Sequence, residues 1–116
     1  MQKVKIVEKP WGKEEIIQLT KSYAVKRITI TAGHRMSLQY HELKEETIYV
    51  LSGNLIVWSS IEFNDNETYC PGSVIHIPPT KVHRFGAPEQ GDVVILECST
   101  TELDDVVRLA DDYDRD

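Results

Sequence analysis

The sequence has little cysteine and no long apolar run. Its two cysteines, Cys70 and Cys98, do not form a CxxC pair, so we expect neither a thiolate metal site nor a disulfide framework. No apolar stretch approaches the roughly 18 residues of a membrane span, and residues 1–5 lack the apolar segment of a signal peptide. These absences predict a soluble cytoplasmic protein with reduced thiols.

Basic residues are also scarce. The chain has 13 Lys and Arg residues against 19 Asp and Glu residues, for a formal net charge of -6. Nucleic acids and anionic membranes bind clustered Lys and Arg, so we expect neither as a partner. An anionic substrate would have to meet a local basic patch. With 116 residues the chain can bury one hydrophobic core, and residues 1–116 are predicted to form a single domain.

Short segments in which apolar and polar residues alternate recur along the chain and indicate β-strands. Turn residues separate the segments, as at Ser52-Gly53-Asn54 and Pro71-Gly72. This pattern is typical of a barrel or a two-sheet sandwich, and no helical stretch lies between the strands, as a parallel βαβ fold would require. The predicted strands cover residues 4–7, 15–19, 23–30, 37–41, 47–51, 55–58, 74–77 and 93–97.

One helix is predicted near the C-terminus. Leu103, Val106, Val107 and Ala110 repeat with helical spacing, and Thr101 is a plausible N-cap that precedes acidic residues in the first turn. The apolar stripe of this helix should pack on the strands. The fold prediction is therefore all-β with one short C-terminal helix.

Four polar residues fall at spacings that strands and turns would bring together. Gln39 and His41 are two apart in a predicted strand, so their side chains share a face, and Glu46 begins the next strand after a turn. His83 follows a corner that prolines fix. The spacings are Gly33-x5-Gln39-x-His41-x4-Glu46-x6-Gly53 and Gly72-x5-Pro78-x-Thr80-x2-His83. We predict that Gln39, His41, Glu46 and His83 form one metal site.

Two nitrogen and two oxygen ligands suit a divalent metal ion. Zinc is the first choice, with manganese, iron, cobalt or nickel as alternatives, because intrinsic affinities do not select among these metals in a cell. Open coordination positions would remain for water or a substrate oxygen, as in catalytic sites. The competing interpretation is that these polar residues are only hydrogen-bonded or solvated and that the site holds no metal.

The two spacings resemble the paired motifs of the cupin superfamily, with Gln39 at the place of the usual first histidine. More narrowly, the chain resembles the isomerase domain of type II mannose-6-phosphate isomerases along nearly its whole length. The most specific shared segments are Lys9-Pro10-Trp11-Gly12 and Gln39-x-His41, and further shared segments are Val25-Lys26-Arg27-Ile28, His83-Arg84 and Asp104-Asp105-Val106-Val107-Arg108. The resemblance implies a small cupin-type jelly-roll barrel.

The resemblance also implies a function. It predicts a divalent-metal-dependent sugar-phosphate isomerase that interconverts mannose 6-phosphate and fructose 6-phosphate by proton transfer through an enediol. The family continues its first motif with a run of histidines and then Arg-Ala-Glu-His, whereas this chain has His41-Glu42-Leu43-Lys44-Glu45-Glu46-Thr47. This departure keeps two alternatives open: another metal-dependent cupin enzyme, such as a dioxygenase, or a non-catalytic cupin that binds a metal or a sugar.

A phosphorylated sugar would need cationic side chains near the metal. The candidates are Arg84, Lys44, Lys26 and Arg27. Arginine suits bidentate contact with phosphate, and lysine provides a point charge. Lys26 and Arg27 are adjacent in a predicted strand and face opposite sides, so the alternation does not decide which of them points inward.

The catalytic base and the oligomeric state rest on weaker signals. Glu97, Glu45 and Lys26 are the candidates for the base, the lysine only if burial lowers its pKa. The continuous apolar run of Leu55–Trp58 indicates either a strand buried on both sides or a contact surface. On the second interpretation we expect a homodimer.

Overall fold

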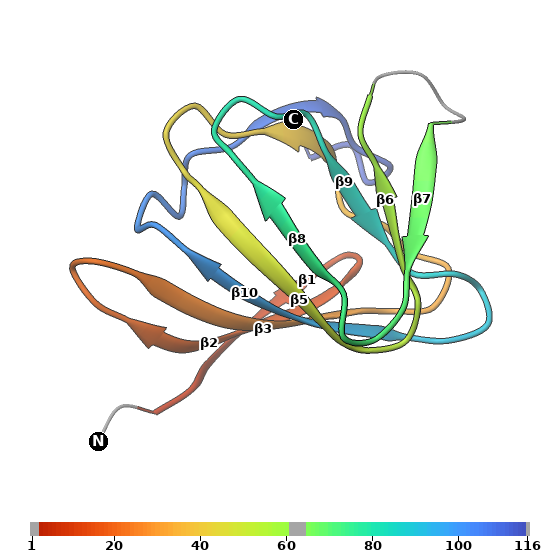
Figure 1. Ribbon diagram of the computed structural model, residues 1–116, viewed down its shortest axis with the longest axis horizontal. Helices are drawn as coiled ribbons and strands as arrows, with labels where there is room; N and C mark the ends of the chain where they lie inside the picture. The colour runs from red at the N-terminus through yellow and green to blue at the C-terminus, as the bar shows by residue number, and fades with distance from the viewer. Residues whose placement is uncertain (1–2, 61–64, 116) are drawn as a thin grey trace.

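The computed structural model describes residues 3–60 and 65–115 and shows strands arranged in three sheets (Figure 1). The predicted all-β class is confirmed, and each predicted segment overlaps a strand. The strands are β1 (Lys5–Lys9), β2 (Gly12–Leu19), β3 (Ala24–Ile30), β4 (Leu38–Tyr40), β5 (Glu46–Ser52), β6 (Leu55–Trp58), β7 (Asn66–Tyr69), β8 (Val74–Ile77), β9 (Arg84–Gly86), β10 (Val93–Ser99) and β11 (Val107–Ala110).

The largest sheet has six strands in the order β1-β2-β3-β10-β5-β8, with antiparallel neighbours. A three-stranded sheet, β7-β6-β9, and a two-stranded sheet, β11-β4, complete the arrangement. Figure 1 shows β6, β7 and β9 on one side of the molecule and β5, β8 and β10 on the other. Within residues 3–60 and 65–115 the three sheets remain separate, so hydrogen bonding does not close one continuous barrel.

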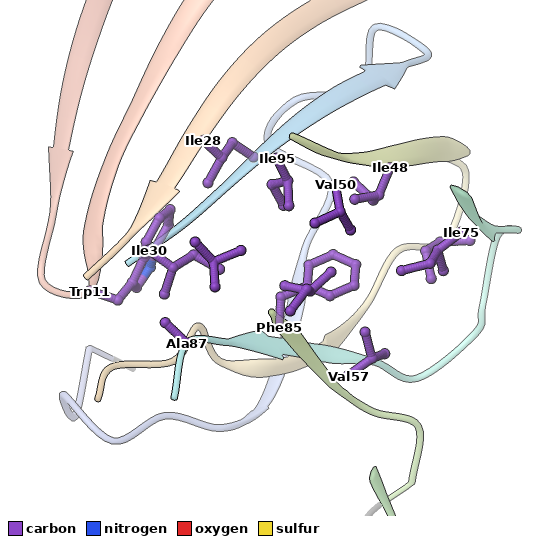
Figure 2. Packing of buried hydrophobic residues seen from close by; sticks show 13 residues of the cluster. Trp11, Ile28, Ile30, Ile48, Val50, Val57, Ile75, Phe85, Ala87 and Ile95 are labelled. Atoms are coloured by element: carbon purple, nitrogen blue, oxygen red, sulfur yellow. The ribbon is translucent and has the colours of Figure 1, made fainter. Parts of the chain in front are cut away.

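The hydrophobic core lies between the six-stranded and the three-stranded sheets. Figure 2 shows Ile28 and Ile95 of the larger sheet opposite Phe85 and Val57 of the smaller one, and all four side chains are buried. Burying an aliphatic or aromatic side chain of this size contributes about 1.5–3 kcal/mol. Because alternate residues of a strand share a face, this packing also fixes which polar residues point inward.

Gly53 makes the tight turn between β5 and β6. Its φ of +78° lies in the left-handed region that side chains disfavour. A Cβ at this position would lie 2.3 Å from the carbonyl oxygen of Asp92. The glycine at the end of the first motif is therefore required by both conformation and space.

The predicted C-terminal helix is wrong. Val107–Ala110 form strand β11, which pairs with β4 so that Arg108 stands opposite Gln39. The apolar residues with helical spacing do not form the face of a helix. Two of them, Leu103 and Val106, line a cavity instead. Adjacent β-branched valines favour a strand once an edge is available for pairing, and this pairing overrides the local periodicity.

No helix in residues 3–60 and 65–115 has the length and apolar character needed to span a membrane.

Candidate metal centre

Backbone pairing brings His41, Glu46 and His83 together. His41 follows β4 and Glu46 begins β5. His83 forms an isolated antiparallel bridge with Gln39, in which the two N–H groups donate to the opposite carbonyls at 3.0 and 2.9 Å. One potential ligand atom from each of His41, Glu46 and His83 lies within 4.8 Å of the others, and all three residues are buried. Three of the four predicted ligands therefore converge on one point.

Both imidazole rings are oriented by backbone carbonyls. Nδ1 of His41 lies 2.6 Å from the carbonyl oxygen of Asp105, and Nδ1 of His83 lies 2.9 Å from that of Lys81. A carbonyl only accepts hydrogen bonds, so each Nδ1 is the donor, and Nε2 is the ring atom left to bind a metal. This is the arrangement found around histidines that bind metals.

The free ring nitrogens face a carboxylate. Among the described residues, Nε2 of His41 and Nε2 of His83 have no hydrogen-bond partner although both atoms are buried. They lie 3.8 and 3.3 Å from Oε1 of Glu46. Buried polar atoms without partners are costly, and a divalent cation bound to Oε1 of Glu46 would satisfy both nitrogens at once. The donor set thus fits a metal ion.

Gln39 lies beside this group but its side chain is already engaged. Its Oε1 accepts a hydrogen bond from Oγ of Ser37 at 2.6 Å, and the residue lines the same cavity as His41 and Glu46. Its backbone bridge with His83 also keeps it next to the centre. Its role as a fourth ligand stays a prediction.

A buried lysine joins the centre to a second carboxyl group. Nζ of Lys44 lies 3.1 Å from Oε2 of Glu46 and 3.4 Å from Oε2 of Glu97. These contacts are ion pairs without hydrogen-bond geometry, since both oxygens lack a hydrogen-bond partner among the described residues. The two oxygens of Glu46 are therefore divided: Oε1 faces the histidines and Oε2 faces the lysine.

The pKa values of Glu46 and Glu97 differ. Burial alone would raise the pKa of Glu46, but the neighbouring His41 and His83 rings and the Lys44 ammonium hold it well below its usual range. Burial, followed by repulsion from Glu46, raises the pKa of Glu97 to about 8. Burial opposes the charge on Lys44, yet the two carboxylates raise its pKa. The same cluster therefore shifts the pKa values of its two carboxyl groups in opposite directions.

A cavity of about 370 Å³ opens beside the centre, and His41, Glu46 and Glu97 line it. Lys26 also points into it and pairs with Glu14 at 3.1 Å. Of the adjacent Lys26 and Arg27, the lysine is therefore the one that faces inward. The cationic side chains of the lining are Lys5, Lys9, Lys26, Lys44, Arg108 and Arg115. The lining also has four acidic side chains, Glu14, Glu46, Glu97 and Asp104, so the six cationic ones outnumber them at this cavity.

Two of the predicted phosphate contacts lie elsewhere. Arg84 is buried, and its guanidinium donates to the carbonyls of Met36 at 2.8 Å and Ala110 at 3.2 Å. Arg27 points outward and pairs with Glu15 at 2.7 Å. Neither arginine lines the cavity. Arg84 instead fastens the C-terminal segment to the sheets.

The candidate bases divide in the same way. Glu97 and Lys26 line the cavity, whereas Glu45 is exposed and contacts His76 at 2.6 Å on the outside. Glu45 directly precedes β5, so it and Glu46 face opposite sides, and the candidate metal ligand Glu46 takes the inward one. Glu45 is therefore not placed to act on a bound molecule in the cavity.

Sequence reasoning missed Asp105. Its carboxylate accepts hydrogen bonds from the backbone N–H groups of Glu42, Leu43 and Lys44 at 3.0, 2.7 and 2.9 Å. These bonds lower the pKa of Asp105. The residue stands in a segment that supported the family resemblance, but the predicted helix concealed its role. It shapes the turn that carries the first motif.

A family model described as the C-terminal region of mannose-6-phosphate isomerase matches residues 1–111. The chain belongs to this family. The solved structure of a cupin-2 domain from Rhodospirillum rubrum superposes with a TM-score of 0.78 at 14% identity, covering 90% of this chain and 74% of that one. This likeness concerns the fold alone and confirms the predicted cupin fold.

Two relatives of known name match nearly the whole chain. A mannose-1-phosphate guanylyltransferase of Escherichia coli is 35% identical over 112 residues, covering 94% of this chain and 23% of that protein. The alginate biosynthesis protein AlgA of Pseudomonas aeruginosa is 32% identical over 114 residues, with the same coverage of 94% and 23%. The chain thus spans about a quarter of the length of these relatives.

The predicted mannose-6-phosphate isomerase function is contradicted by these names. The relatives are named for guanylyl transfer to a mannose phosphate and for polysaccharide biosynthesis, and neither is named an isomerase. The family resemblance was right, but the reaction inferred from it was wrong. The E. coli relative is named for mannose 1-phosphate and the P. aeruginosa relative for alginate biosynthesis.

Proposed function

We propose that this chain is a metal-binding cupin domain that binds a phosphorylated mannose, in the same metabolism as its guanylyltransferase relatives. One observation carries the proposal: His41 and Glu46, from the candidate metal centre, line the same cavity as the buried ammonium of Lys26. A metal and a phosphate would therefore bind within one cavity. The names of the guanylyltransferase relatives support mannose 1-phosphate as the ligand.

Zinc is our first assignment for the metal, with manganese, iron, cobalt or nickel as alternatives. His41 and His83 would supply neutral nitrogens, Glu46 an oxygen and Gln39 a further oxygen. A divalent cation bound there would polarise an oxygen of the sugar and fix its orientation. The protein contributes ring orientation, through Asp105 and Lys81, and exclusion of water by burial.

The phosphate would bind the cationic part of the cavity lining. A phosphate dianion in a chain of net charge -6 needs a concentrated positive field. Lys26 is 6% exposed and provides a fixed point charge, and Arg108 and Arg115 add positive charge, the latter while it donates to Asp111 at 2.7 and 3.2 Å. Lys5 and Lys9 add charge from β1.

Two finer predictions accompany this proposal. We expect the protein in the cytoplasm, where sugar phosphates are made and used.

We also expect a homodimer that forms through the outer side of β6. In β6, Leu55 and Val57 belong to the core, whereas Ile56 and Trp58 are half-buried on the outer side. The Arg35 guanidinium lies 5.4 Å from the centre of the Trp58 ring.

Calorimetric titration of the zinc-loaded protein tests the proposed function. The panel consists of mannose 1-phosphate, mannose 6-phosphate, glucose 1-phosphate, free mannose and inorganic phosphate. We expect the mannose phosphates to bind more tightly than free mannose or phosphate alone, because only they engage the metal side and the cationic side of the cavity together. A protein that takes up zinc but binds no phosphorylated sugar would refute the ligand assignment.

A further inference from the structure

Lys44 occupies an unusual position for a cation. Its side chain is 7% exposed, and its Nζ lies 3.1 Å from the carboxylate of Glu46, which is a ligand of the candidate metal centre. An ammonium at this distance from a ligand repels a divalent ion bound to the same carboxylate. The lysine therefore weakens the attraction of the site for a metal, and its presence calls for another explanation.

Structural support alone does not explain the lysine well. A buried ion pair often contributes no more to stability than apolar residues of similar volume. Nor is Lys44 free to bind a phosphate, because Glu46 and Glu97 both contact its Nζ at 3.4 Å or less. Lys26, which has only Glu14 as its ion-pair partner among the described residues, is better placed for that role.

The backbone of Lys44 is held in place independently of its side chain. Its N–H donates to the carboxylate of Asp105 at 2.9 Å, and the two preceding residues donate to the same carboxylate. The following strand begins at Glu46, two residues later. The ammonium is thus fixed relative to the metal ligand by a short, clamped segment.

We propose that Lys44 is a positioning residue that limits how many carboxylate oxygens can reach the metal. It holds Oε2 of Glu46, so that only Oε1 faces His41 and His83, and it also holds Oε2 of Glu97. The remaining coordination positions then stay open for the sugar. This inference rests on the proposed function, because it requires a metal at the centre.

The sign of the effect on metal affinity separates this role from a merely structural one. A residue that only supports the site would lower the affinity for metal by about 10–100-fold when it is replaced. Replacing Lys44 by methionine removes the repulsion and frees two carboxyl groups. We expect Lys44→Met to bind zinc at least about tenfold more tightly than the parent chain. Loss of a merely supporting residue would instead weaken zinc binding.

Competition with a chromophoric chelator measures the zinc affinity. The visible absorption spectrum of bound cobalt shows whether the set of metal ligands has changed. The variants are Lys44→Met, Lys44→Arg and the double variant Lys44→Met with Glu97→Gln. Lys44→Arg should keep the parent affinity and spectrum. Lys44→Met should bind zinc more tightly and show an altered cobalt spectrum. In the double variant, the zinc affinity and the cobalt spectrum should both return most of the way to those of the parent.

Equal or weaker zinc binding by a folded Lys44→Met overturns the inference. If that variant does not fold, Glu97→Gln alone decides: unchanged zinc affinity supports the inference, and a loss of about tenfold or more shows that Glu97 already binds the metal, which overturns it. The parent chain is the control for the proposed function. Failure of the parent to bind zinc or cobalt refutes both proposals, whereas metal binding by the parent confines any failure to the role of Lys44.

Discussion

The carbonyl oxygen of Asp105 lies 2.6 Å from Nδ1 of His41. The same residue accepts three backbone hydrogen bonds through its carboxylate from the turn that follows His41. Asp105 thus orients a candidate metal ligand with its backbone and shapes the adjoining turn with its side chain. Metal binding and the conformation of the 42–44 turn should therefore depend on each other.

Asp105→Ala should weaken metal binding without emptying the site. The variant keeps the carbonyl that orients His41 but releases the N–H groups of Glu42, Leu43 and Lys44. We expect the zinc affinity to fall about tenfold, the lower end of the range for groups that support metal ligands. Chelator competition measures the change, and Asp104→Ala is the control, since it removes the same charge from an exposed neighbour. Equal affinities for the two variants would show that the turn does not support the site.

Lys26→Met should weaken binding of sugar phosphate and leave metal affinity nearly unchanged. The substitution removes a buried point charge from the cavity while keeping the length of the side chain. We expect at least a tenfold loss of affinity for mannose 1-phosphate, about 1.4 kcal/mol, by calorimetric titration of the zinc-loaded protein. Lys13→Met is the control, because Lys13 is not part of the cavity lining. If both variants bind the sugar phosphate equally well, the phosphate does not contact Lys26.

Gly53→Ala should destabilise the fold. A Cβ would lie 2.3 Å from the carbonyl oxygen of Asp92, in a conformation with φ at +78°. We expect the free energy of unfolding to drop by about 2–3 kcal/mol in urea titrations, since both steric overlap and strain contribute. Gly91→Ala serves as the control, because its Cβ would meet no atom within 4 Å. A loss at Gly53 no larger than that at Gly91 would contradict the described turn.

Asp112→Asn should destabilise the protein in a pH-dependent way. The guanidinium of Arg35 donates to Asp112 at 2.6 and 3.0 Å, and this hydrogen bonding lowers the pKa of the carboxyl group. A lowered pKa contributes stability above the unfolded value near 4 and loses it as the pH falls through the folded value.

The difference between the parent and Asp112→Asn in free energy of unfolding should be under about 1 kcal/mol at pH 7, because the pair is partly exposed. It should shrink as the pH falls below about 4. Urea titrations from pH 3 to pH 7 measure it, and Asp114→Asn controls for the same charge change. A difference that stays constant down to pH 3 would show that the ion pair contributes nothing.

The sequence predicts those features that follow from alternation and short spacing. Gln39, His41 and Glu46 are close in sequence, so strand geometry alone places them together, and the proline corner before His83 completes the group. Residues such as Ile28 and Ile95 show the alternation of a sheet with one buried face.

Other features depend on contacts between distant segments. β9 is only three residues long and β7 is polar, so neither gives a periodic signal. Val107–Ala110 became a strand because β4 offered an edge for pairing, which no local pattern reveals. Arg84 could not be told from a phosphate ligand, because its partners Met36 and Ala110 are remote in sequence. The reaction was also beyond the sequence motifs, which identify the family and not its chemistry.

The most direct test of the metal centre is the zinc content of the purified chain after loading and removal of excess metal, measured by elemental analysis. We predict about one zinc ion per chain in the parent and in His76→Ala, whose histidine is exposed, and almost none in His83→Ala. Zinc retained by His83→Ala at the level of the parent, or absent from the parent itself, would contradict the account.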